Sequence, residues 1–206
     1  GIVTPAVFER GIRVTTAAAA NAVPVAEFTV AMMVAMLKQI PWVIGSYIRG
    51  DGRQLGPIRE LRDLSVGLVA AGRIGREVIR LLGAYPRLTI KVYDPYLSPE
   101  DARMLGVERA SLEDVCRCDV VSIHAPDLPE TRRMINARML ALLPDHAVLI
   151  NTSRGALVDE PALVAEVRRR PLYVLLDVTD PEPPRPDSPL RREPNILLTP
   201  HLSGAM

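Results

Sequence analysis

A glycine or a side chain that can do chemistry stands just after a short apolar run at six places in this chain. The runs span residues 66–70, 88–93, 119–123, 147–150, 172–176 and 196–198, and the residues that follow them are Gly72, Asp94, His124, Arg154, Asp177 and His201. Short runs rich in β-branched residues are typical of buried parallel strands, and ligands of such sheets bind beyond the carboxyl ends of the strands. We therefore expect these side chains to converge on one edge of a sheet and to form the site there.

Arg154 and His201 are the first candidates for catalysis. A guanidinium is suited to bidentate capture of a carboxylate, and an imidazole is suited to proton exchange with a carbonyl or alcohol oxygen. Glu182, in the loop before the last run, is a candidate partner that would hold the His201 ring in one tautomer. Each group alone also has an ordinary explanation: a surface ion pair for Arg154, a solvated loop charge for Glu182 and a satisfied turn residue for His201.

The turn after the first run has the composition of a dinucleotide-binding loop. A pyrophosphate needs a tight turn from strand to helix, backbone without a nearby Cβ, and the positive end of a helix. Gly72 and Gly75 meet the second and third needs, and Arg73 and Ile74 lie between them. Ala70 stands where the first glycine of G-x-G-x-x-G would be. The motif alone is weak, because ordinary strand-to-helix turns also carry such glycines.

Asp94 strengthens the nucleotide hypothesis because it ends the next run along the chain. A carboxylate at that place can accept hydrogen bonds from both ribose hydroxyls of an adenosine. It would also repel a 2′-phosphate, and the following residues, Pro95 and Tyr96, supply no cation to bind one. The sequence therefore favours NAD over NADP.

The alternation of short runs and longer amphipathic segments predicts an α/β fold with a doubly wound parallel sheet, a Rossmann-like dinucleotide-binding domain. A helix is expected over residues 73–82, and Ser111 is expected to cap a short helix. Glu160 and Pro161 open another helix that runs to about Arg169. Six prolines between residues 181 and 194 predict a surface loop.

An apolar helix is expected over residues 23–37, with Asn21 as its N-cap and Pro24 in its first turn. Pro41 is expected to kink or end this helix, and residues 45–56 are expected to form a loop. The charges of Glu27 and Lys38 shorten the uncharged part of the segment below the roughly 20 residues that a bilayer core requires. We therefore expect a buried helix of a soluble protein.

The composition narrows the class of protein. A chain of 206 residues with 48% hydrophobic residues can bury one good core. Its net charge of +1 gives no excess of positive charge of the kind that attracts nucleic acid or an anionic membrane. Cys116 and Cys118 lack a second pair, so they are expected to be small buried residues or free thiols and not a metal site or disulfide. Gly1 opens the chain without an initiator Met or signal peptide, which indicates an excised piece of a cytoplasmic protein.

The chain resembles the nicotinamide-binding domain of the D-isomer-specific 2-hydroxyacid dehydrogenases from about residue 11 to its final residues. The motifs that carry this resemblance are the loop at 66–76, the stretch 122–126 with Thr131, the NTSRG-x-x-x-D pattern at 151–159, Asp177-Val178 followed by Glu182-Pro183, and Thr199-Pro200-His201. The resemblance implies that Arg154 binds the substrate carboxylate, His201 is the acid/base and Glu182 is its partner. The NAD-binding residues that it implies are Gly72, Arg73, Ile74, Gly75, Asp94, His124, Pro126, Thr131, Thr152, Ser153, Asp177 and His201.

Three departures from the family pattern bear on these expectations. Ala70 replaces a glycine, which is harmless at a negative φ and otherwise costs about 1 kcal/mol or more. Thr179 stands where an aromatic residue is common, and Asp180 is a rival to Glu182, which we retain because its spacing and the following Pro183 match.

The resemblance also implies parts that lie outside this chain. Residues 1–20 are expected to be a remnant of a substrate domain and its linker, and residues 21–206 the NAD-binding domain. The intact parent is expected to form a homodimer through the long helix after Asn21.

We expect the parent to interconvert a 2-oxo acid and a D-2-hydroxy acid with NAD, and the chain alone to be inactive. A non-catalytic NAD(H)-sensing module resembling a corepressor and a nucleotide-dependent methyltransferase are the alternatives.

Overall fold

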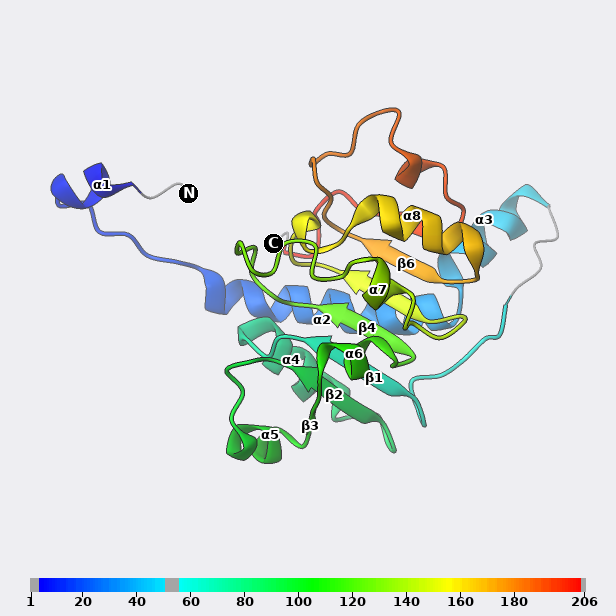
Figure 1. The fold of residues 1–206 in the computed structure, drawn as a ribbon, viewed down its shortest axis with the longest axis horizontal. Helices are drawn as coiled ribbons and strands as arrows, with labels where there is room; N and C mark the ends of the chain where they lie inside the picture. The colour runs from blue at the N-terminus through cyan, green and yellow to red at the C-terminus, as the bar shows by residue number, and fades with distance from the viewer. Residues whose placement is uncertain (1–3, 51–55, 205–206) are drawn as a thin grey trace.

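The computed structural model describes residues 4–50 and 56–204 (Figure 1). Its centre is a seven-stranded parallel sheet in the order β3-β2-β1-β4-β5-β6-β7. The strands are β1 (Ser65–Val69), β2 (Thr89–Tyr93), β3 (Glu108–Arg109), β4 (Val120–Ile123), β5 (Val148–Asn151), β6 (Tyr173–Leu176) and β7 (Ile196–Leu198). The strand order reverses between β1 and β4, which confirms the doubly wound fold and places a ligand crevice at their carboxyl ends.

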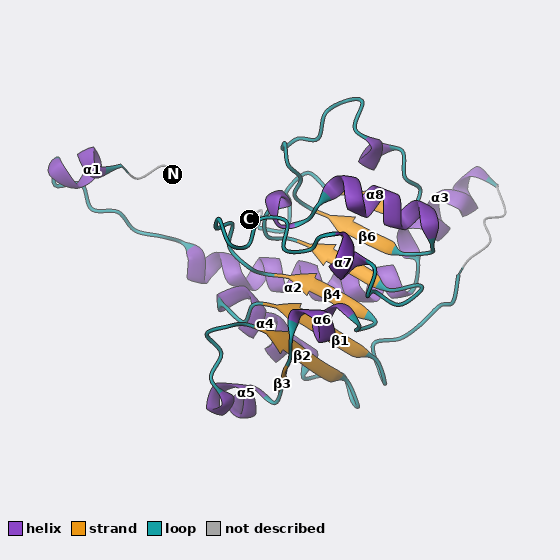
Figure 2. Ribbon diagram, viewed as in Figure 1, coloured by secondary structure: helices purple, strands orange, loops and turns teal. Residues whose placement is uncertain are grey.

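Helices cover both faces of this sheet (Figure 2). On one face the core is completed by α2 (Ala18–Leu37), α4 (Arg73–Leu82) and α5 (Pro99–Leu105), and on the other by α6 (Leu112–Cys116), α7 (Ala137–Leu140) and α8 (Glu160–Arg169). A further helix, α3 (Ile40–Arg49), packs against α2, while α1 (Pro5–Glu9) lies away from the sheet (Figure 1). Two short 3₁₀ turns, η1 (Gly155–Leu157) and η2 (Pro189–Arg191), lie in the loops after β5 and β6.

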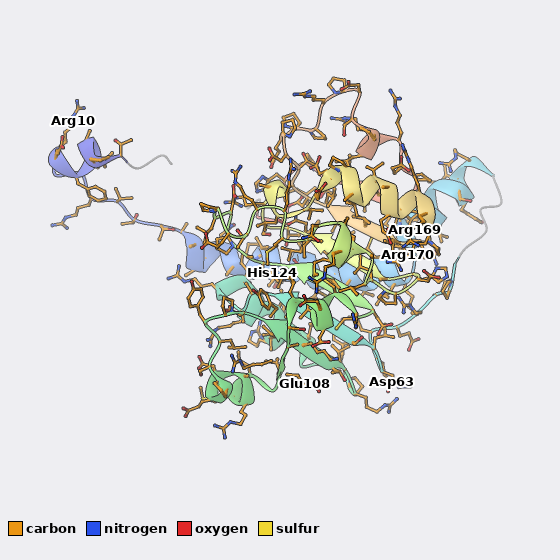
Figure 3. All side chains as sticks on the ribbon, in the orientation of Figure 1. Arg10, Asp63, Glu108, His124, Arg169 and Arg170 are labelled. Carbon is orange, nitrogen blue, oxygen red and sulfur yellow. The ribbon has the colours of Figure 1, made fainter. Side chains whose placement is uncertain are left out.

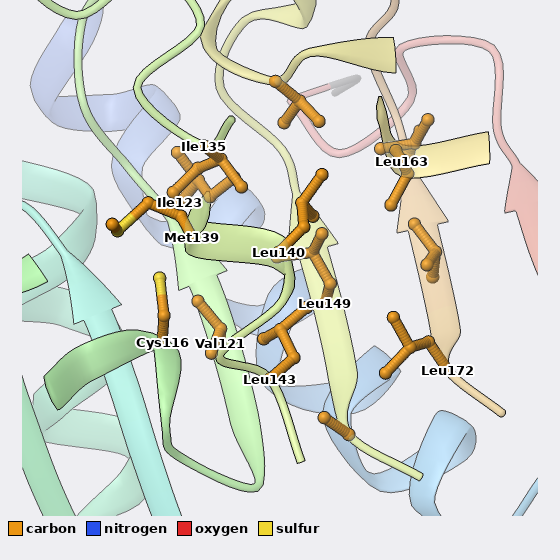
Figure 4. Close-up of a cluster of buried hydrophobic side chains, with 14 of the residues drawn as sticks. Cys116, Val121, Ile123, Ile135, Met139, Leu140, Leu143, Leu149, Leu163 and Leu172 are labelled. Atoms are coloured by element: carbon orange, nitrogen blue, oxygen red, sulfur yellow. The ribbon is translucent and has the colours of Figure 1, made fainter. Parts of the chain in front are cut away.

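The cluster of apolar side chains beneath α6, α7 and α8 shows why the runs form strands. Val121 and Ile123 of β4 and Leu149 of β5 alternate along their strands and point into this cluster (Figure 4). Cys116 and Cys118 are buried in the same cluster and free, as expected, and burial raises the pKa of the Cys116 thiol to about 12.

All six predicted strands are present, with bounds within one residue of those expected. The predicted helix over 73–82 is α4, and the helices expected after Ser111 and at Glu160 are α6 and α8. Strand β3 was not predicted, because Glu108 and Arg109 are exposed and form no apolar run. Residues 181–194 form the expected loop, interrupted by the single turn η2.

The expectations for the segment before the sheet were wrong in three places. Helix α2 begins at Ala18 with Ala17 as its N-cap, so Asn21 is not the cap and Pro24 lies inside the helix. The alanines before Asn21 have the highest helix propensity and extend the helix toward the N-terminus. Pro41 does not end α2, which stops at Leu37, but stands in the first turn of α3, where a missing N–H is tolerated.

Helix α3 also replaces part of the loop that was expected over residues 45–56. It continues through Gly45 to Arg49 and ends at Gly50, whose left-handed backbone terminates the helix. Residues 51–55 of the expected loop lie outside the described residues.

In the described part of the chain, α2 is the one helix long and apolar enough to cross a membrane. It nevertheless packs against α4 and β5, and its Ala26, Met33 and Met36 are fully buried. These contacts agree with the expected buried helix.

A hydrogen-bond network joins β1, β4 and β5 at the amino ends of the strands. The Asp119 carboxylate accepts hydrogen bonds from Ser65 N at 2.9 Å, Ser65 Oγ at 2.7 Å and Arg59 Nη1 at 2.8 Å. Arg59 Nη2 also donates to the carbonyl of His146, just before β5, at 2.7 Å. Burial acts to raise the pKa of Asp119, but the bonds from Ser65 and Arg59 hold it below its usual range.

The last described residues, after β7, return to the first turns of helix α2. A Cβ added to Gly204 would lie 2.8 Å from Asn21 Oδ1, so the segment after β7 packs directly on α2.

Candidate active site

The turn after β1 has the geometry expected of a phosphate-binding loop. Gly72 is the N-cap of α4, and a Cβ added to it would meet nothing within 4 Å, so this side of the loop is open. A Cβ added to Gly75 would lie 2.4 Å from the carbonyl oxygen of Ala70, so only glycine allows the helix to approach the turn this closely. Arg73 is exposed and Ile74 half-buried in the first turn of α4, whose free N–H groups favour an anion.

The sequence left open whether the φ of Ala70 is negative or positive, and the structure shows the strained, positive value. Its φ is +75°, in the left-handed region that favours glycine, and its N–H donates to the Tyr93 carbonyl at 2.7 Å. The turn therefore keeps the backbone path of a glycine loop, at a cost of about 1 kcal/mol or more for the alanine side chain.

Asp94 lies beside this loop, as expected from the parallel pairing of β1 and β2. Its Oδ2 accepts a hydrogen bond from Ala71 N at 2.8 Å, and its Oδ1 accepts one from Tyr96 N at 2.8 Å. The carboxylate is thus fixed against the phosphate loop and half-exposed. A carboxylate oxygen has a second lone pair, so both oxygens retain capacity to accept a hydroxyl.

His124 follows β4, next to β1, and lies toward the interior of the molecule (Figure 3). Its Nε2 is 3.0 Å from Ser122 Oγ, and its buried Nδ1 has no hydrogen-bond partner in the described part of the chain. Burial lowers the pKa of His124 to about 4, so the ring is neutral at pH 7. In the loop after His124, the Thr131 hydroxyl donates a hydrogen bond to the Pro126 carbonyl at 2.6 Å. This bond closes the loop that contains Pro126 and Thr131, both of which were expected to contact NAD.

The turn after β5 presents Arg154. The Asn151 side chain holds this turn, because its Oδ1 accepts from Ser153 N at 3.0 Å and its Nδ2 donates to the Arg154 carbonyl at 2.8 Å. Arg154 is exposed, and its Nη1 donates to the Ser153 carbonyl at 2.6 Å. Thr152 is buried, with its hydroxyl 3.2 Å from that of Thr29 in α2. The turn-forming role of Asn151 was not predicted, although an Asn two residues before a turn N–H is a known signal.

Glu182 and His201 form the expected pair. Glu182 Oε1 lies 2.6 Å from His201 Nδ1, and the two side chains are 40% and 45% exposed, so both reach solvent at the carboxyl edge of the sheet. Asp180, the rival carboxylate, is exposed, and its backbone N–H donates to Glu160 Oε1 at 2.8 Å.

Asp177 is turned toward the segment that carries His201. Its Oδ1 accepts from Thr199 Oγ1 at 2.6 Å and from Leu202 N at 2.9 Å, and its Oδ2 accepts from Ser203 N at 3.0 Å. Burial acts to raise the pKa of this carboxyl, but the bonds from Ser203, Thr199 and Leu202 hold it below its usual range. Asp177 was expected to contact NAD. In the structure, its carboxylate accepts hydrogen bonds from the segment that carries His201.

The expected residues thus follow neighbouring strands at one edge of the sheet, from Asp94 after β2 and the loop after β1 to His201 after β7. Because all these strands are parallel and adjacent, their carboxyl ends form a continuous edge. This edge combines an anion-binding helix end, an exposed guanidinium and an imidazole paired with a carboxylate. Such a set can bind a dinucleotide and exchange a proton with an anionic substrate.

The family model of the D-isomer specific 2-hydroxyacid dehydrogenase, NAD binding domain, matches residues 30–203. The D-3-phosphoglycerate dehydrogenase of Methanocaldococcus jannaschii is 36% identical over 198 residues, which are 94% of this chain and 37% of that protein. The chain thus spans little more than a third of the length of this curated relative.

Solved structures are similar over the same region. The TT0316 protein from Thermus thermophilus has a TM-score of 0.84 and 36% identity, over 98% of this chain and 64% of that one. An NAD-dependent formate dehydrogenase from Staphylococcus aureus in complex with NAD has a TM-score of 0.81 and 30% identity, over 89% of this chain and 56% of that one.

Proposed function

Because this chain belongs to the D-isomer specific 2-hydroxyacid dehydrogenase family, as the match to its NAD binding domain shows, we propose that the full-length protein interconverts a 2-oxo acid and a D-2-hydroxy acid by hydride transfer. The observation that carries this proposal is the 2.6 Å contact between His201 Nδ1 and Glu182 Oε1, at the sheet edge that also holds the glycine loop. A dinucleotide site alone requires no such pair.

The chain's own loop fits NAD. Gly75 leaves no room for a Cβ beneath the turn, whereas Gly72 opens to free space, and Asp94 stands beside the loop without a cation after it. When bound, the nicotinamide accepts or supplies the hydride. We assign NAD contacts to the loop residues Gly72, Arg73, Ile74 and Gly75, and to Asp94, His124, Pro126, Thr131, Thr152, Ser153, Asp177 and His201.

His201 and Arg154 would act on the substrate. A carboxylate that accepts the Nδ1–H of His201 leaves Nε2 as the nitrogen that exchanges a proton with the substrate oxygen. The exposed guanidinium of Arg154 uses one donor on the Ser153 carbonyl and keeps others for the substrate carboxylate. Charge that develops on the carbonyl oxygen would be stabilised by the same guanidinium.

The full-length protein tests this proposal. Oxidation of NADH, followed by absorbance across glyoxylate, hydroxypyruvate, pyruvate and a phosphorylated 2-oxo acid, should identify a substrate. His201→Asn should then lower turnover by about a hundredfold or more while NADH affinity stays within a few-fold, because acid/base catalysis is typically worth 10² to 10⁴.

A matched control is His146→Asn, since His146 lies before β5, at the amino ends of the strands. This variant should keep its turnover within about twofold when folded. A wild-type protein that binds NADH but reduces none of these acids would instead support the NAD(H)-sensing module.

We further propose that the intact protein is a cytoplasmic homodimer that needs no nucleic acid or membrane. The net charge of +1 and the long α2, whose outer face includes the half-exposed Val23, support this assignment. Residues 1–20 are assigned to a substrate domain and linker, supported by the position of α1 away from the sheet and its lack of buried residues, and residues 21–206 to the NAD-binding domain (Figure 1).

A further inference from the structure

The segment Thr179–Pro183 carries Glu182 from the end of β6 to the imidazole of His201. It belongs to a surface loop without regular structure, and Glu182 itself is 40% exposed. A short contact of 2.6 Å between two half-exposed side chains requires that the backbone beneath one of them be held in place. Contacts from the segment 155–160 supply that restraint.

Gly155, directly after Arg154, lies flush against this backbone. A Cβ added to Gly155 would lie 2.0 Å from the carbonyl carbon of Thr179 and 2.6 Å from Asp180 N. No side chain fits between the two segments. The turn that presents Arg154 and the loop that presents Glu182 are therefore in direct backbone contact.

Glu160 adds a polar bond to this contact. Its Oε1 accepts a hydrogen bond from Asp180 N at 2.8 Å, two residues before Glu182. Burial, together with the nearby charge of Asp180, raises the pKa of the Glu160 carboxyl against the opposing effect of that bond. Glu160 therefore occupies an environment that disfavours its charge, and the bond to the loop offsets only part of this effect.

A role of Glu160 in capping α8 does not explain this arrangement. Asp159 already caps the helix, with its Oδ1 accepting from Ala162 N at 3.1 Å. The Glu160 carboxylate points instead to the loop after β6.

We propose that Glu160 is a positioning residue: through the Asp180 N–H it fixes the loop that orients Glu182 on His201, and with Gly155 it holds this loop on the turn that presents Arg154. This inference rests on the proposed function for its catalytic meaning. The effect of Glu160 on the contact between Glu182 and His201 can be measured without turnover.

The first measurement is the NMR signal of the His201 ring in the full-length protein labelled with ¹⁵N-histidine, assigned with His201→Asn. Wild type should show a protected Nδ1–H bonded to a carboxylate, and Glu182→Gln should shift it. Glu160→Ala and Glu160→Asp should weaken or abolish this signal, whereas Glu160→Gln, whose amide oxygen can accept the same N–H, should retain it.

Glu160→Asp separates positioning from helix stabilisation. It keeps a negative charge in the first turn of α8, so a purely helical role predicts wild-type behaviour, but its shorter side chain withdraws from Asp180 N. The matched control is Glu100→Ala, which removes an exposed acid from the first turn of α5 and should leave the His201 signal unchanged.

Kinetics supply the second measurement. Glu160→Ala and Glu160→Asp should lower kcat by about tenfold or more and change its pH profile, with KM for NADH within about twofold, because misplacement of a catalytic group by about 1 Å can cost a hundredfold. A folded Glu160→Asp variant with the wild-type His201 signal would overturn the inference. An inactive wild type would overturn the proposed function alone, since the NMR result still decides whether Glu160 positions Glu182.

Discussion

Ala70 combines the backbone of a glycine with the side chain of an alanine. Its φ of +75° is sterically unfavourable for a residue with a Cβ, and it lies in the turn between β1 and the N-terminus of α4. The turn retains this shape because the packing of Gly75 against the Ala70 carbonyl and the bond from Ala70 N to Tyr93 O determine it. The phosphate loop is thus intact in path and strained at one residue.

Ala70→Gly should therefore stabilise the domain by about 1 kcal/mol, since glycine adopts this φ without the steric penalty. Urea unfolding measures the effect, and fluorescence titration should show NADH affinity equal to or tighter than wild type. The neighbouring Ala71→Gly is the matched control. Ala71 has no positive φ, so added backbone freedom should destabilise that variant. A loss of stability in Ala70→Gly as large as that in Ala71→Gly would contradict the strain.

His124 gives the domain a specific sensitivity to acid. Because its pKa is about 4 in the folded protein and near 6.5 when unfolded, only the unfolded state binds a proton between these values. Stability from this group is therefore complete above about pH 6.5 and is lost as the pH falls toward about 4, by an amount on the order of 3 kcal/mol at most.

Urea unfolding at pH 7.5, 6, 5 and 4.5 tests this on wild type and on His124→Gln, which can still bond to Ser122 but does not titrate. The wild type should lose more stability than the variant over this range. Parallel curves would show that His124 is not the group responsible.

At the scale of the elements, helix α2 is anchored by its methionines. Met33 and Met36 are fully buried on the face that packs toward β5 and α4, whereas the neighbouring Met32 is half-buried. The helix therefore derives its stability from one face, as expected for a core helix.

Met33→Ala should lower the free energy of unfolding by about 2–5 kcal/mol, the range for large-to-small changes in a packed core. Met32→Ala is the same chemical change one position away and should have a clearly smaller effect. Denaturant unfolding of both variants decides the matter, and equal losses would mean that α2 is not seated on the sheet as described.

The strands could be predicted from the sequence because each forms an apolar run with a polar residue after it. Strand β3 could not, since its two residues are exposed and pair only through their backbone. The start of α2 could not be placed from the capping preference of Asn21, because the alanine run outweighs it, and Pro41 opens α3 although proline is equally typical of a helix end.

Some features of the candidate site could also be predicted from the sequence, and others could not. The resemblance implied that His201 pairs with Glu182 and not with Asp180, because Glu182 and the following Pro183 match the family pattern, and the structure shows this contact. The supporting roles of Asn151 and Glu160 were not predicted, because each binds backbone N–H groups that a sequence pattern does not identify. The φ of Ala70 was likewise left open by the sequence and is decided by the fold.

At the scale of the whole molecule, the carboxyl ends and the amino ends of the parallel strands have different roles. The carboxyl edge holds the exposed polar groups of the candidate site, while the amino edge is tied together by Asp119, Ser65 and Arg59. Groups that need to contact ligands are thus remote from the network that joins the strands.

The chain alone should bind NADH but show no turnover, because the phosphate loop and Asp94 are present while hydride transfer requires a substrate held in a closed cleft. Fluorescence titration and a 2-oxo acid assay on one sample measure both. Turnover by the chain alone would show that the substrate site lies within these 206 residues. A folded chain without NADH binding would show that Ala70 blocks the loop.

The contact of Gly204 with Asn21 has a mechanical consequence. The contact joins the first turns of α2 to the segment after β7, so each of these two segments restrains the other where both lie against the sheet domain. The same proximity means that a short linker from residue 204 to residue 21 would allow new termini to be opened elsewhere, as in a circular permutant.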